Sequence, residues 1–402
     1  MKKSFYLFSI ACAGMLFTST ALTSCSSDDD PEEQQEEVTV LVAGIPDDGD
    51  ATPNPNVDNN TTNIPNIVCN TEYENGVPVI RIDMTGVQES LGNEWLRLYG
   101  TGSDKQNVWV EVDGKPKGIS VRNTADDNDG NAKVMADLVF LVDNSGSMSE
   151  EADAIARDIT TWSQNLAKIL DINYGCVGYG GNVGSQFSYL IDGYGVTGAL
   201  DITTSTELGK YLNERGQTNT RRTVGYAGDN ASVLSQAALN YYYKAGGECG
   251  VQALRFADEN FNFRKGANRI YVNFTDDANY TGGDDDISIN YVLNSGKWDT
   301  YKGTIHSVIS NDTTWIKKIS IGECPWRLSQ YTGGTILVVP SNFYGVTLET
   351  LPVTGAMQNS YIIRFTNIAN LMDGKTHDVK VTILTQDGKT MAEKTFSVTF
   401  AS

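Results

Sequence analysis

The segment Asp143-Asn144-Ser145-Gly146-Ser147 places one carboxylate and two hydroxyls at alternate positions. It follows the apolar run 136–142, which is typical of a buried parallel strand, and it precedes a helical pattern. The three side chains therefore belong to a loop at the carboxyl end of a strand, where open α/β sheets bind ligands. Carboxylate and hydroxyl oxygens suit Mg²⁺, Ca²⁺ or Mn²⁺, so the segment predicts a metal site.

The elements around this loop alternate between strands and helices from residue 134 to residue 340. After the strand at 137–143, apolar residues spaced by four, three, four and three predict a helix with one buried face, namely Ile155, Ile159, Trp162, Leu166 and Ile169. Further strands are predicted at 172–180, 185–191, 268–275, 304–309 and 335–339, and helices at 206–214, 233–244 and 250–260. This alternation predicts an α/β domain, a doubly wound and mostly parallel sheet with helices on both faces.

The two flanks of this domain are β-rich. In residues 68–125, strands are predicted at 77–84, 95–99, 107–112 and 117–121, and in residues 346–400 at 361–365, 378–385 and 394–400. Val379, Val381 and Ile383 alternate with polar residues, as half-buried strands do. Each flank alone has few strands for a sandwich, whereas together they have enough for an immunoglobulin-like one. The hypothesis is that residues 134–340 are inserted into one sandwich built from 68–133 and 341–402; two small β domains are the alternative.

The loop at Asp143 resembles the metal-ion-dependent adhesion site of von Willebrand factor type A domains, in which Asp-x-Ser-x-Ser follows the first strand. In that family a Thr or an acidic residue opens a helix on a second loop, and here Ser232 matches that position best, with Asp229 as the alternative. A third loop supplies an Asp after the next strand, and here Asp276 matches. Serine in place of the usual threonine is a departure from the pattern.

The resemblance implies a divalent cation, Mg²⁺ or else Ca²⁺ or Mn²⁺, held by Asp143, Ser145, Ser147, Ser232 and Asp276. It also implies that a protein or glycan partner supplies an acidic group to the ion. Two alternatives are a metal that only pins the loop and a site without metal. Glu150 and Glu151 stand where some relatives bind a second cation, although acidic residues also favour the first turn of any helix.

The N-terminus has the features of an export signal. Lys2 and Lys3 precede an apolar stretch and small residues, which predicts a signal peptide over residues 1–24. The sequence Leu22-Thr23-Ser24-Cys25 resembles the lipobox of bacterial lipoproteins, and the acidic residues that follow resemble surface-export signals of Bacteroidetes lipoproteins. This implies lipidation at Cys25, an outer-membrane location exposed at the cell surface, and a membrane contact through the lipid only. A plain secretory signal is the alternative.

The charge of the chain restricts its partners. The formal net charge is −20 over 402 residues, and residues 26–60 hold eleven Asp or Glu and no Lys or Arg. This composition predicts a disordered acidic tether over residues 25–67. An acidic chain lacks the basic patches that nucleic acids require, so no nucleic acid is expected as a partner.

Cysteines and histidines are few. Export permits disulfides, and Cys249 and Cys324 are candidates for a pair, whereas Cys176 is predicted to be a core thiol. His306 lies in a predicted strand and His377 in the C-terminal flank, so no Ser-His or Cys-His relay can be placed near Asp143. The sequence therefore predicts a non-enzymatic surface protein of the adhesin type, with a structural component of a surface or fimbrial assembly as the alternative.

Overall fold

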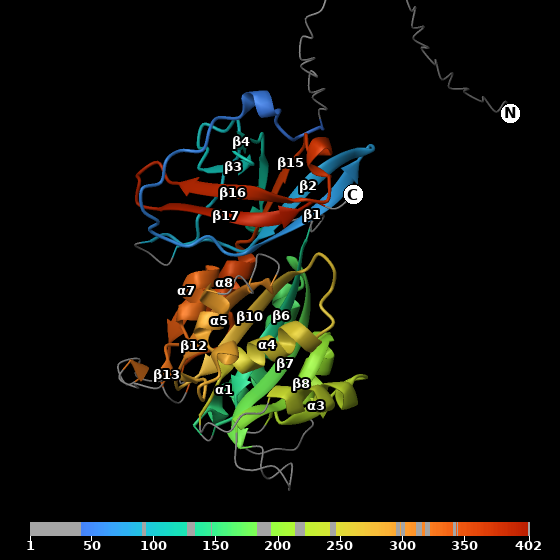
Figure 1. Cartoon of the computed structure of the whole chain (residues 1–402), viewed down its shortest axis with the longest axis vertical. Coiled ribbons are helices and arrows are strands. Elements are labelled where there is room, and N and C mark those ends of the chain that lie inside the picture. The colour runs from blue at the N-terminus through green and yellow to red at the C-terminus, as the bar shows by residue number, and fades with distance from the viewer. Residues whose placement is uncertain are drawn as a thin grey trace, which may run out of the picture. The chain divides into compact units, whose positions relative to one another are not determined.

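The computed structural model describes residues 42–90, 94–126, 133–145, 147–182, 194–213, 222–241, 247–294, 298, 302–310, 316–317, 322–340, 343 and 345–400. The predicted signal peptide, Cys25 and the strand predicted at 185–191 lie outside these residues. Figure 1 shows an α/β part built on a seven-stranded sheet and a β-rich part built on two four-stranded sheets. In the part of the chain that is described, no helix is long and apolar enough to cross a membrane.

The central strand of the α/β part carries Asp143 at its carboxyl end. This strand, β6 (Val134–Asp143), pairs in parallel with β7 (Leu170–Asn182) and with β10 (Asn268–Thr275). The full order is β14-β12-β10-β6-β7-β8-β9, and β8 runs antiparallel to β7. The other strands are β8 (Tyr194–Thr203), β9 (Gly225–Ala227), β12 (Thr304–Ile309) and β14 (Ile336–Val338). The prediction of a mostly parallel sheet is confirmed, and the carboxyl ends of β6, β7 and β10 share one edge.

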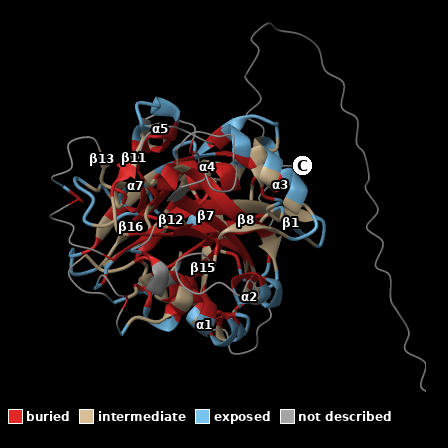
Figure 2. Ribbon diagram, turned by 90° about the horizontal axis from the view of Figure 1, so that it is seen from below, coloured by how far each residue is buried: buried red, intermediate tan, exposed pale blue. Residues whose placement is uncertain are grey.

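Helices cover both faces of this sheet, as Figure 2 shows. Successive side chains of a strand point to opposite faces, and β6 follows this rule: Leu138 and Phe140 pack with α1 and α2, whereas Val139 and Leu141 pack with α3, α4 and α5. The helices are α1 (Ser149–Leu166), α2 (Ser205–Asn213), α3 (Ala231–Ala238), α4 (Gly250–Asn260), α5 (Ile289–Asn294), α7 (Arg327–Thr332) and α8 (Pro352–Gln358). A small separate sheet pairs β11 (Asn279–Tyr280) with β13 (Gly322–Glu323).

Helix α1 directly follows the loop that carries Ser145 and Ser147. The predicted apolar stripe is confirmed, because Ile155, Ile159, Trp162 and Leu166 are all buried in the core on its side of the sheet. The ring of Trp162 lies between Phe140 and Tyr174, with ring centroids 5.9 Å from each. Burial of an aromatic side chain of this size stabilises a domain by a few kcal/mol. The helix is therefore fixed to the sheet close to the loop that it follows.

The α/β core extends beyond the predicted boundary at residue 340. Leu348, Leu351, Val353 and Met357 belong to the same apolar cluster as α1. Helix α8, which the sequence analysis did not predict, has only seven residues and a proline at its start. Its apolar pattern is too short to be distinguished from a strand by periodicity. The boundary of this domain therefore lies near residue 360.

The two remaining large sheets face each other across one apolar core. One has the order β1-β2-β15-β5 and the other β17-β16-β3-β4, so both contain strands from both flanks. Strand β15 pairs with β2 and β5, and β16 pairs with β3. The strands are β1 (Ile67–Glu74), β2 (Val77–Met84), β3 (Val108–Val112), β4 (Lys115–Pro116), β5 (Ser120–Asn123), β15 (Tyr361–Phe365), β16 (Thr376–Leu384) and β17 (Met391–Thr399). The strand predicted at 95–99 was wrong, since only Trp95 forms an isolated bridge, to Gln88.

The prediction of a disordered acidic tether over residues 25–67 is wrong for its second half, residues 42–66. Residues 42–66 lie along the sandwich, where the side chain of Asp48 pairs with Lys117 at 2.9 Å. Thr61 exchanges hydrogen bonds with Met391, at the start of β17. Val42 and Ile45 pack with Val79 in a small apolar cluster. Composition alone suggested disorder, but these contacts with strands far along the chain hold the segment in place.

None of the four cysteines of the described residues, Cys69, Cys176, Cys249 and Cys324, forms a disulfide. The pairing of Cys249 with Cys324 considered above is therefore wrong. Cys249 is buried, and its thiol donates to the carbonyl oxygen of Ile287. Cys176 is buried in β7, as predicted.

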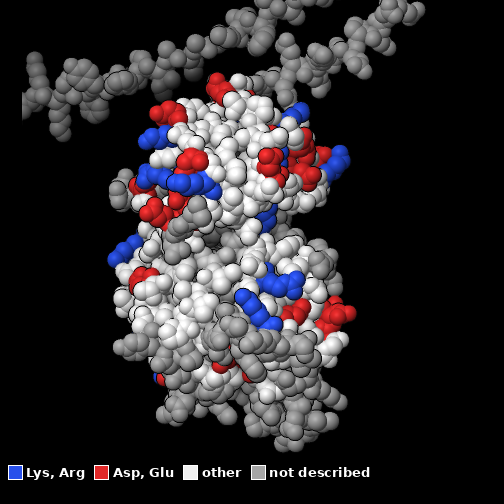
Figure 3. All heavy atoms as spheres, turned by 90° about the vertical axis from the view of Figure 1, so that its left-hand side faces the viewer, with Lys and Arg blue, Asp and Glu red and all other residues white. Residues whose placement is uncertain are grey.

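Charged side chains are mixed on the surface drawn in Figure 3. Lys and Arg lie among Asp and Glu, most densely over the sandwich, and neither sign forms a continuous patch on that face. The acidic character of the chain is therefore not expressed as one patch on this surface. A closer grouping of carboxylates lies at the carboxyl end of β6.

Candidate metal site

Asp143 is held from two loops at the carboxyl edge of the sheet. Its side chain is buried, and its Oδ1 accepts a hydrogen bond of 2.8 Å from the backbone N–H of Ser145. Its Oδ2 accepts a hydrogen bond of 3.1 Å from the hydroxyl of Thr275, at the end of β10. Both carboxylate oxygens are therefore oriented by neighbours before any ligand binds.

The two serines of the loop stand beside Asp276. The hydroxyls of Ser145 and Ser147 lie 3.2 Å apart, and Ser147 is hydrogen-bonded to the carboxylate of Asp276. The structure thus brings together four of the five principal residues predicted from the sequence: Asp143, Ser145, Ser147 and Asp276. The side chains of Glu150 and Glu151 lie outside the described residues.

Hydrogen bonds of Asn144 connect the loop that carries Ser145 and Ser147 to neighbouring segments. Its backbone N–H donates to the carbonyl of Tyr179, and its amide nitrogen donates to the hydroxyl of Thr197 at 2.7 Å. Its amide oxygen accepts a hydrogen bond from the hydroxyl of Thr223. A Cβ on Gly178 would lie 2.4 Å from the amide nitrogen of Asn144, so only glycine fits beneath this side chain. Asn144 therefore sets the position of the loop that carries Ser145 and Ser147.

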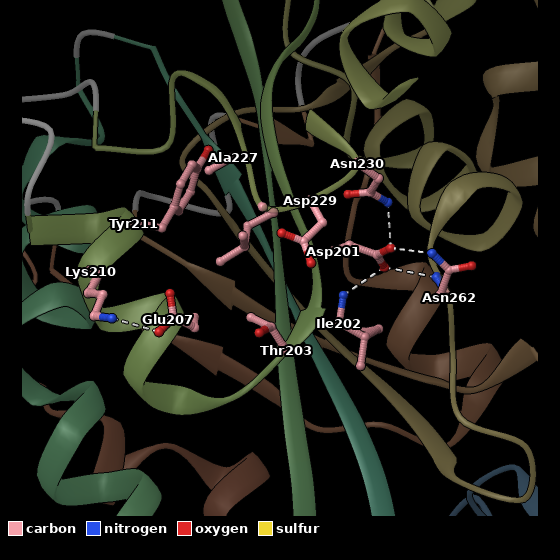
Figure 4. Close-up of a pocket in the computed structure, with 12 residues that line it drawn as sticks. Asp201, Ile202, Thr203, Glu207, Lys210, Tyr211, Ala227, Asp229, Asn230 and Asn262 are labelled. Carbon is pink, nitrogen blue, oxygen red and sulfur yellow. Dashed lines mark hydrogen bonds and ion pairs between the residues drawn. The ribbon is translucent and has the colours of Figure 1, made fainter. Parts of the chain in front are cut away.

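Ser232 and its alternative Asp229 do not reach this site. Strand β9 pairs in parallel with β8, which is antiparallel to β7, so β9 leads the chain away from the edge that holds Asp143. Asn230 then donates to Asp201, which also accepts two hydrogen bonds from Asn262. These residues line a pocket of about 710 Å³ at the far edge (Figure 4). The assignment of the second loop to Ser232 or Asp229 was wrong.

Glu248 lies close to Asp143, although it was not predicted from the sequence. A Cβ built on Gly180 would lie 2.7 Å from Oδ1 of Asp143 and 3.0 Å from Cγ of Glu248, so both side chains pack against Gly180. Glu248 precedes α4, the helix that leads into β10 and Asp276. The sequence Gly246-Gly247-Glu248 before a predicted helix was the signal for it. Glu248 was missed because the earlier loop with Asp229 and Ser232, which also precedes a predicted helix, was assigned to this role.

The carboxylates of this site act on one another. Burial raises the pKa of Asp143 well above its ordinary value, and the negative charge of Glu248 raises it further. Burial also raises the pKa of Glu248, to about 7, and the charges of Asp277 and Asp276 add to that effect. No ion pair with Lys or Arg reaches Asp143 or Glu248 within the described residues.

The donors suit a hard divalent cation. All are oxygens, from carboxylates and hydroxyls. In the described part of the chain, no three His, Cys, Asp or Glu side chains converge to hold an ion by themselves. Any ion here would therefore need the hydroxyls of Ser145 and Ser147 as well as carboxylates. Four of these donors, on Asp143, Ser145, Ser147 and Asp276, are ones that the sequence predicted.

Comparisons with known proteins were made by sequence and by structure. No protein-family model matches the chain, and no curated protein matches it. Similar solved structures include BatB of Bacteroides thetaiotaomicron, described as a conserved hypothetical protein, at 13% identity over 56% of this chain and 96% of that chain, with a TM-score of 0.30. Proximal thread matrix protein 1 from the mussel byssus, with a zinc-occupied MIDAS motif, has 9% identity over 61% of this chain and 49% of that chain, with a TM-score of 0.32.

A third similar structure is described as von Willebrand factor type A from Catenulispora acidiphila, at 11% identity over 75% of this chain and 76% of that chain, with a TM-score of 0.28. A parallel sheet with one antiparallel strand, β8, carries the Asp-x-Ser-x-Ser loop at the end of its central strand. The α/β part of this chain has a von Willebrand factor type A-like fold.

Proposed function

We propose that the chain is a surface lipoprotein that binds a protein or glycan ligand through a divalent cation held at the carboxyl end of β6. The observation that carries the proposal is the gathering of Asp143, Ser145, Ser147 and Asp276 from two loops around one buried carboxylate. Carboxylate and hydroxyl oxygens are the donors that Mg²⁺, Ca²⁺ and Mn²⁺ accept.

In this proposal the protein groups have distinct roles. Asp143 and Asp276 would supply charge, and Ser145 and Ser147 would supply neutral oxygens. Asn144 and Thr275 would orient them through the hydrogen bonds described above. The cation, when bound, offers a positive centre with an open position for a ligand oxygen. The hydroxyl of Ser147 is exposed, so that position faces solvent.

The proposal assigns no catalytic step to either histidine. His306 is buried in β12, and burial lowers its pKa to about 3, so it is neutral at physiological pH. His377 lies in the sandwich, where its ring contacts Asp113 and Asp373. Neither residue belongs to the loops around Asp143.

We also infer that the α/β domain is inserted into a single sandwich and that the N-terminus anchors the chain by a lipid on Cys25. Pairing of β15 with β2, and of β16 with β3, supports the first inference. The lipobox-like sequence before Cys25 supports the second. An insertion would attach the metal-binding domain to the sandwich at two points, and the sandwich would carry the anchor.

The second candidate function is a component of a surface or fimbrial assembly in which the cation only pins the loop. The dense hydrogen bonding of Asn144, which fixes the loop without any ion, favours this reading. Binding and thermal unfolding distinguish the two. If the chain is an adhesin, removing the cation abolishes ligand binding. If the cation only stabilises the loop of an assembly component, removing it lowers the unfolding temperature and leaves partner binding intact.

The test compares two variants in the purified chain. Asp143→Asn removes the central charge with little change in shape, and Ser232→Ala is the matched control at the opposite edge of the sheet. Cation binding is measured by calorimetry, and binding to matrix proteins and glycans is measured with Mg²⁺ or Ca²⁺ and with EDTA. We expect Asp143→Asn to abolish both and Ser232→Ala to preserve both. Ligand binding that survives EDTA would contradict the proposal.

A further inference from the structure

Tyr211 connects helix α2 to the loop that carries Ser145 and Ser147. Tyr211 is buried, and its hydroxyl lies 2.9 Å from the carbonyl oxygen of Thr223 and 2.9 Å from that of Gly225, to which it donates. Gly225 begins β9, so these hydrogen bonds hold the chain at the entry to that strand. The position of Thr223 therefore depends on a helix that supplies no residue to the candidate metal site.

Thr223 is confined between Tyr211 and the sheet. A Cβ on Gly178 would lie 2.2 Å from the carbonyl oxygen of Thr223, and a Cβ on Gly198 would lie 2.1 Å from it. Thr223 is fully buried, and only the backbone of β7 and β8 lies beneath its carbonyl group. Loss of the Tyr211 hydroxyl would therefore remove one of the two contacts that fix this carbonyl group.

Thr223 in turn holds Asn144, which follows Asp143. The hydroxyl of Thr223 donates to the amide oxygen of Asn144, and the amide nitrogen of Asn144 donates to the hydroxyl of Thr197 at 2.7 Å. The three side chains are buried, so each hydrogen bond that is lost leaves a polar group without a partner and without water. Hydrogen bonds thus link Tyr211 to Thr223, and Thr223 to Asn144.

We infer that Tyr211 is a remote positioning residue of the metal loop (residues 143–147), which it orients through Thr223 and Asn144. The inference rests on the proposed function, because the position of the loop affects binding only if a cation is held at Asp143. Residues that orient metal ligands from outside the coordination shell change metal affinity by about 10- to 100-fold when they are mutated. The ring of Tyr211 also lines the pocket of about 710 Å³ in Figure 4, so a surface pocket lies at the far end of this route.

The first experiment measures the binding of Mg²⁺ and of Ca²⁺ to the purified chain by calorimetry. Tyr211→Phe removes one hydroxyl and keeps the ring, and it should weaken cation binding by about tenfold. Tyr226→Phe is the matched control, because the hydroxyl of Tyr226 also donates to a backbone carbonyl, that of Val196 on β8 at 2.8 Å. This control should leave the affinity unchanged. An unchanged affinity in Tyr211→Phe, or an equal loss in both variants, would overturn the inference.

The second experiment is a double-mutant cycle, which tests whether Tyr211 acts through Thr223. Thr223→Val removes the hydroxyl that donates to Asn144 and should weaken cation binding by about tenfold or more, whereas Thr223→Ser keeps a hydroxyl and should bind like the wild type. Tyr211→Phe combined with Thr223→Val should bind no more weakly than Thr223→Val alone, because the link is already broken. Additive losses would show that Tyr211 does not act through Thr223, against the inference.

Hydrogen exchange in EDTA separates this inference from the proposed function. The backbone N–H of Asn144 donates to the carbonyl of Tyr179. Its exchange should be faster in Tyr211→Phe than in the wild type or in Tyr226→Phe, because the loop opens more often. If the wild-type chain binds no divalent cation, the proposed function is wrong, and exchange alone decides whether Tyr211 holds the loop. If cations bind and exchange is the same in all three chains, the role of Tyr211 is wrong and the proposed function stands.

Discussion

The indole N–H of Trp162 donates a hydrogen bond of 2.9 Å to the hydroxyl of Thr354, and both side chains are buried. Trp162 lies on α1, which begins directly after the metal loop, and Thr354 lies on α8, which leads into β15 of the sandwich. On its other side α8 meets the sandwich, because a Cβ on Gly355 would lie 2.4 Å from the indole nitrogen of Trp95. The α/β domain and the sandwich therefore both pack against α8.

Thr354→Val should destabilise the chain by about 1–3 kcal/mol, because it leaves the buried indole N–H of Trp162 and the carbonyl of Leu348 without this partner. Valine preserves the shape, so the loss comes from the hydrogen bonds. Chemical denaturation measures it. Thr395→Val, on the exposed face of β17, is the control and should stay within about 0.5 kcal/mol of the wild type. Equal stability of the two variants would contradict the role given to Thr354.

Gly180→Ala should weaken cation binding as well as stability. Gly180 has φ of +81°, and a Cβ there would lie 2.7 Å from Oδ1 of Asp143. Gly102 has φ of +83° with nothing within 4 Å of such a Cβ, so Gly102→Ala has the same backbone cost, about 1 kcal/mol, without the crowding. Calorimetry and thermal unfolding of both variants separate the two effects. Unchanged cation affinity in Gly180→Ala would show that Oδ1 of Asp143 does not bind the ion.

Asn144→Ala should cost about 2 kcal/mol or more, because the hydroxyls of Thr197 and Thr223 lose a buried partner. Cation affinity should fall too, since the loop loses its attachment to the neighbouring strands. Asn165→Ala on α1, which removes a solvent-exposed hydrogen bond to Glu349, is the control. A variant that loses stability but binds the cation as tightly as the wild type would show that Asn144 has no positioning role.

The stability contributed by His377 should depend on pH. Its two ring nitrogens lie 2.7 Å from Asp113 and 3.1 Å from Asp373, so both can donate only when the ring is protonated. The hydrogen bond with Asp113 raises the pKa of His377 and lowers the pKa of Asp113. The contribution is therefore complete between about pH 3.9 and about pH 6.5, the ordinary values of the two groups. It is lost as pH rises through the higher pKa of His377, and as pH falls through the lower pKa of Asp113.

This dependence is measured by denaturation of the wild type and of Asp113→Asn across pH 3 to about pH 9. The difference in unfolding free energy between them should be largest near pH 5 and shrink on either side. A difference that stays constant over this range would exclude the ionised pair.

Calcium should raise the unfolding temperature of the wild-type chain, because a ligand that binds only the folded state stabilises that state. At a free concentration one hundred times the dissociation constant the gain is about 2.7 kcal/mol. Differential scanning calorimetry with Ca²⁺ and with EDTA measures it, and Asp143→Asn should show no gain. A calcium effect of equal size in Asp143→Asn would place the ion elsewhere.

Local patterns predicted much of this structure. The apolar run before Asp143 and the stripe that includes Ile155 and Trp162 identified β6 and α1, because these patterns follow directly from strand and helix periodicity. Strands with clear alternation, such as β16 with Val379 and Val381, were also found. Helix α8 and the binding of residues 42–66 to the sandwich were missed, because both depend on contacts with distant segments.

The candidate site shows the same division. The sequence by itself determined Asp143, Ser145, Ser147 and Asp276, since each follows a strand whose direction in a parallel sheet is fixed by the alternation of elements. Only the tertiary structure decided that Ser232 lies at the opposite edge and that Glu248 stands beside Asp143. The physical reason is that β8 runs antiparallel to β7 and β9 runs parallel to β8. The loop after β9 therefore lies at the opposite edge of the sheet, whereas the loop before α4 lies at the edge that holds Asp143.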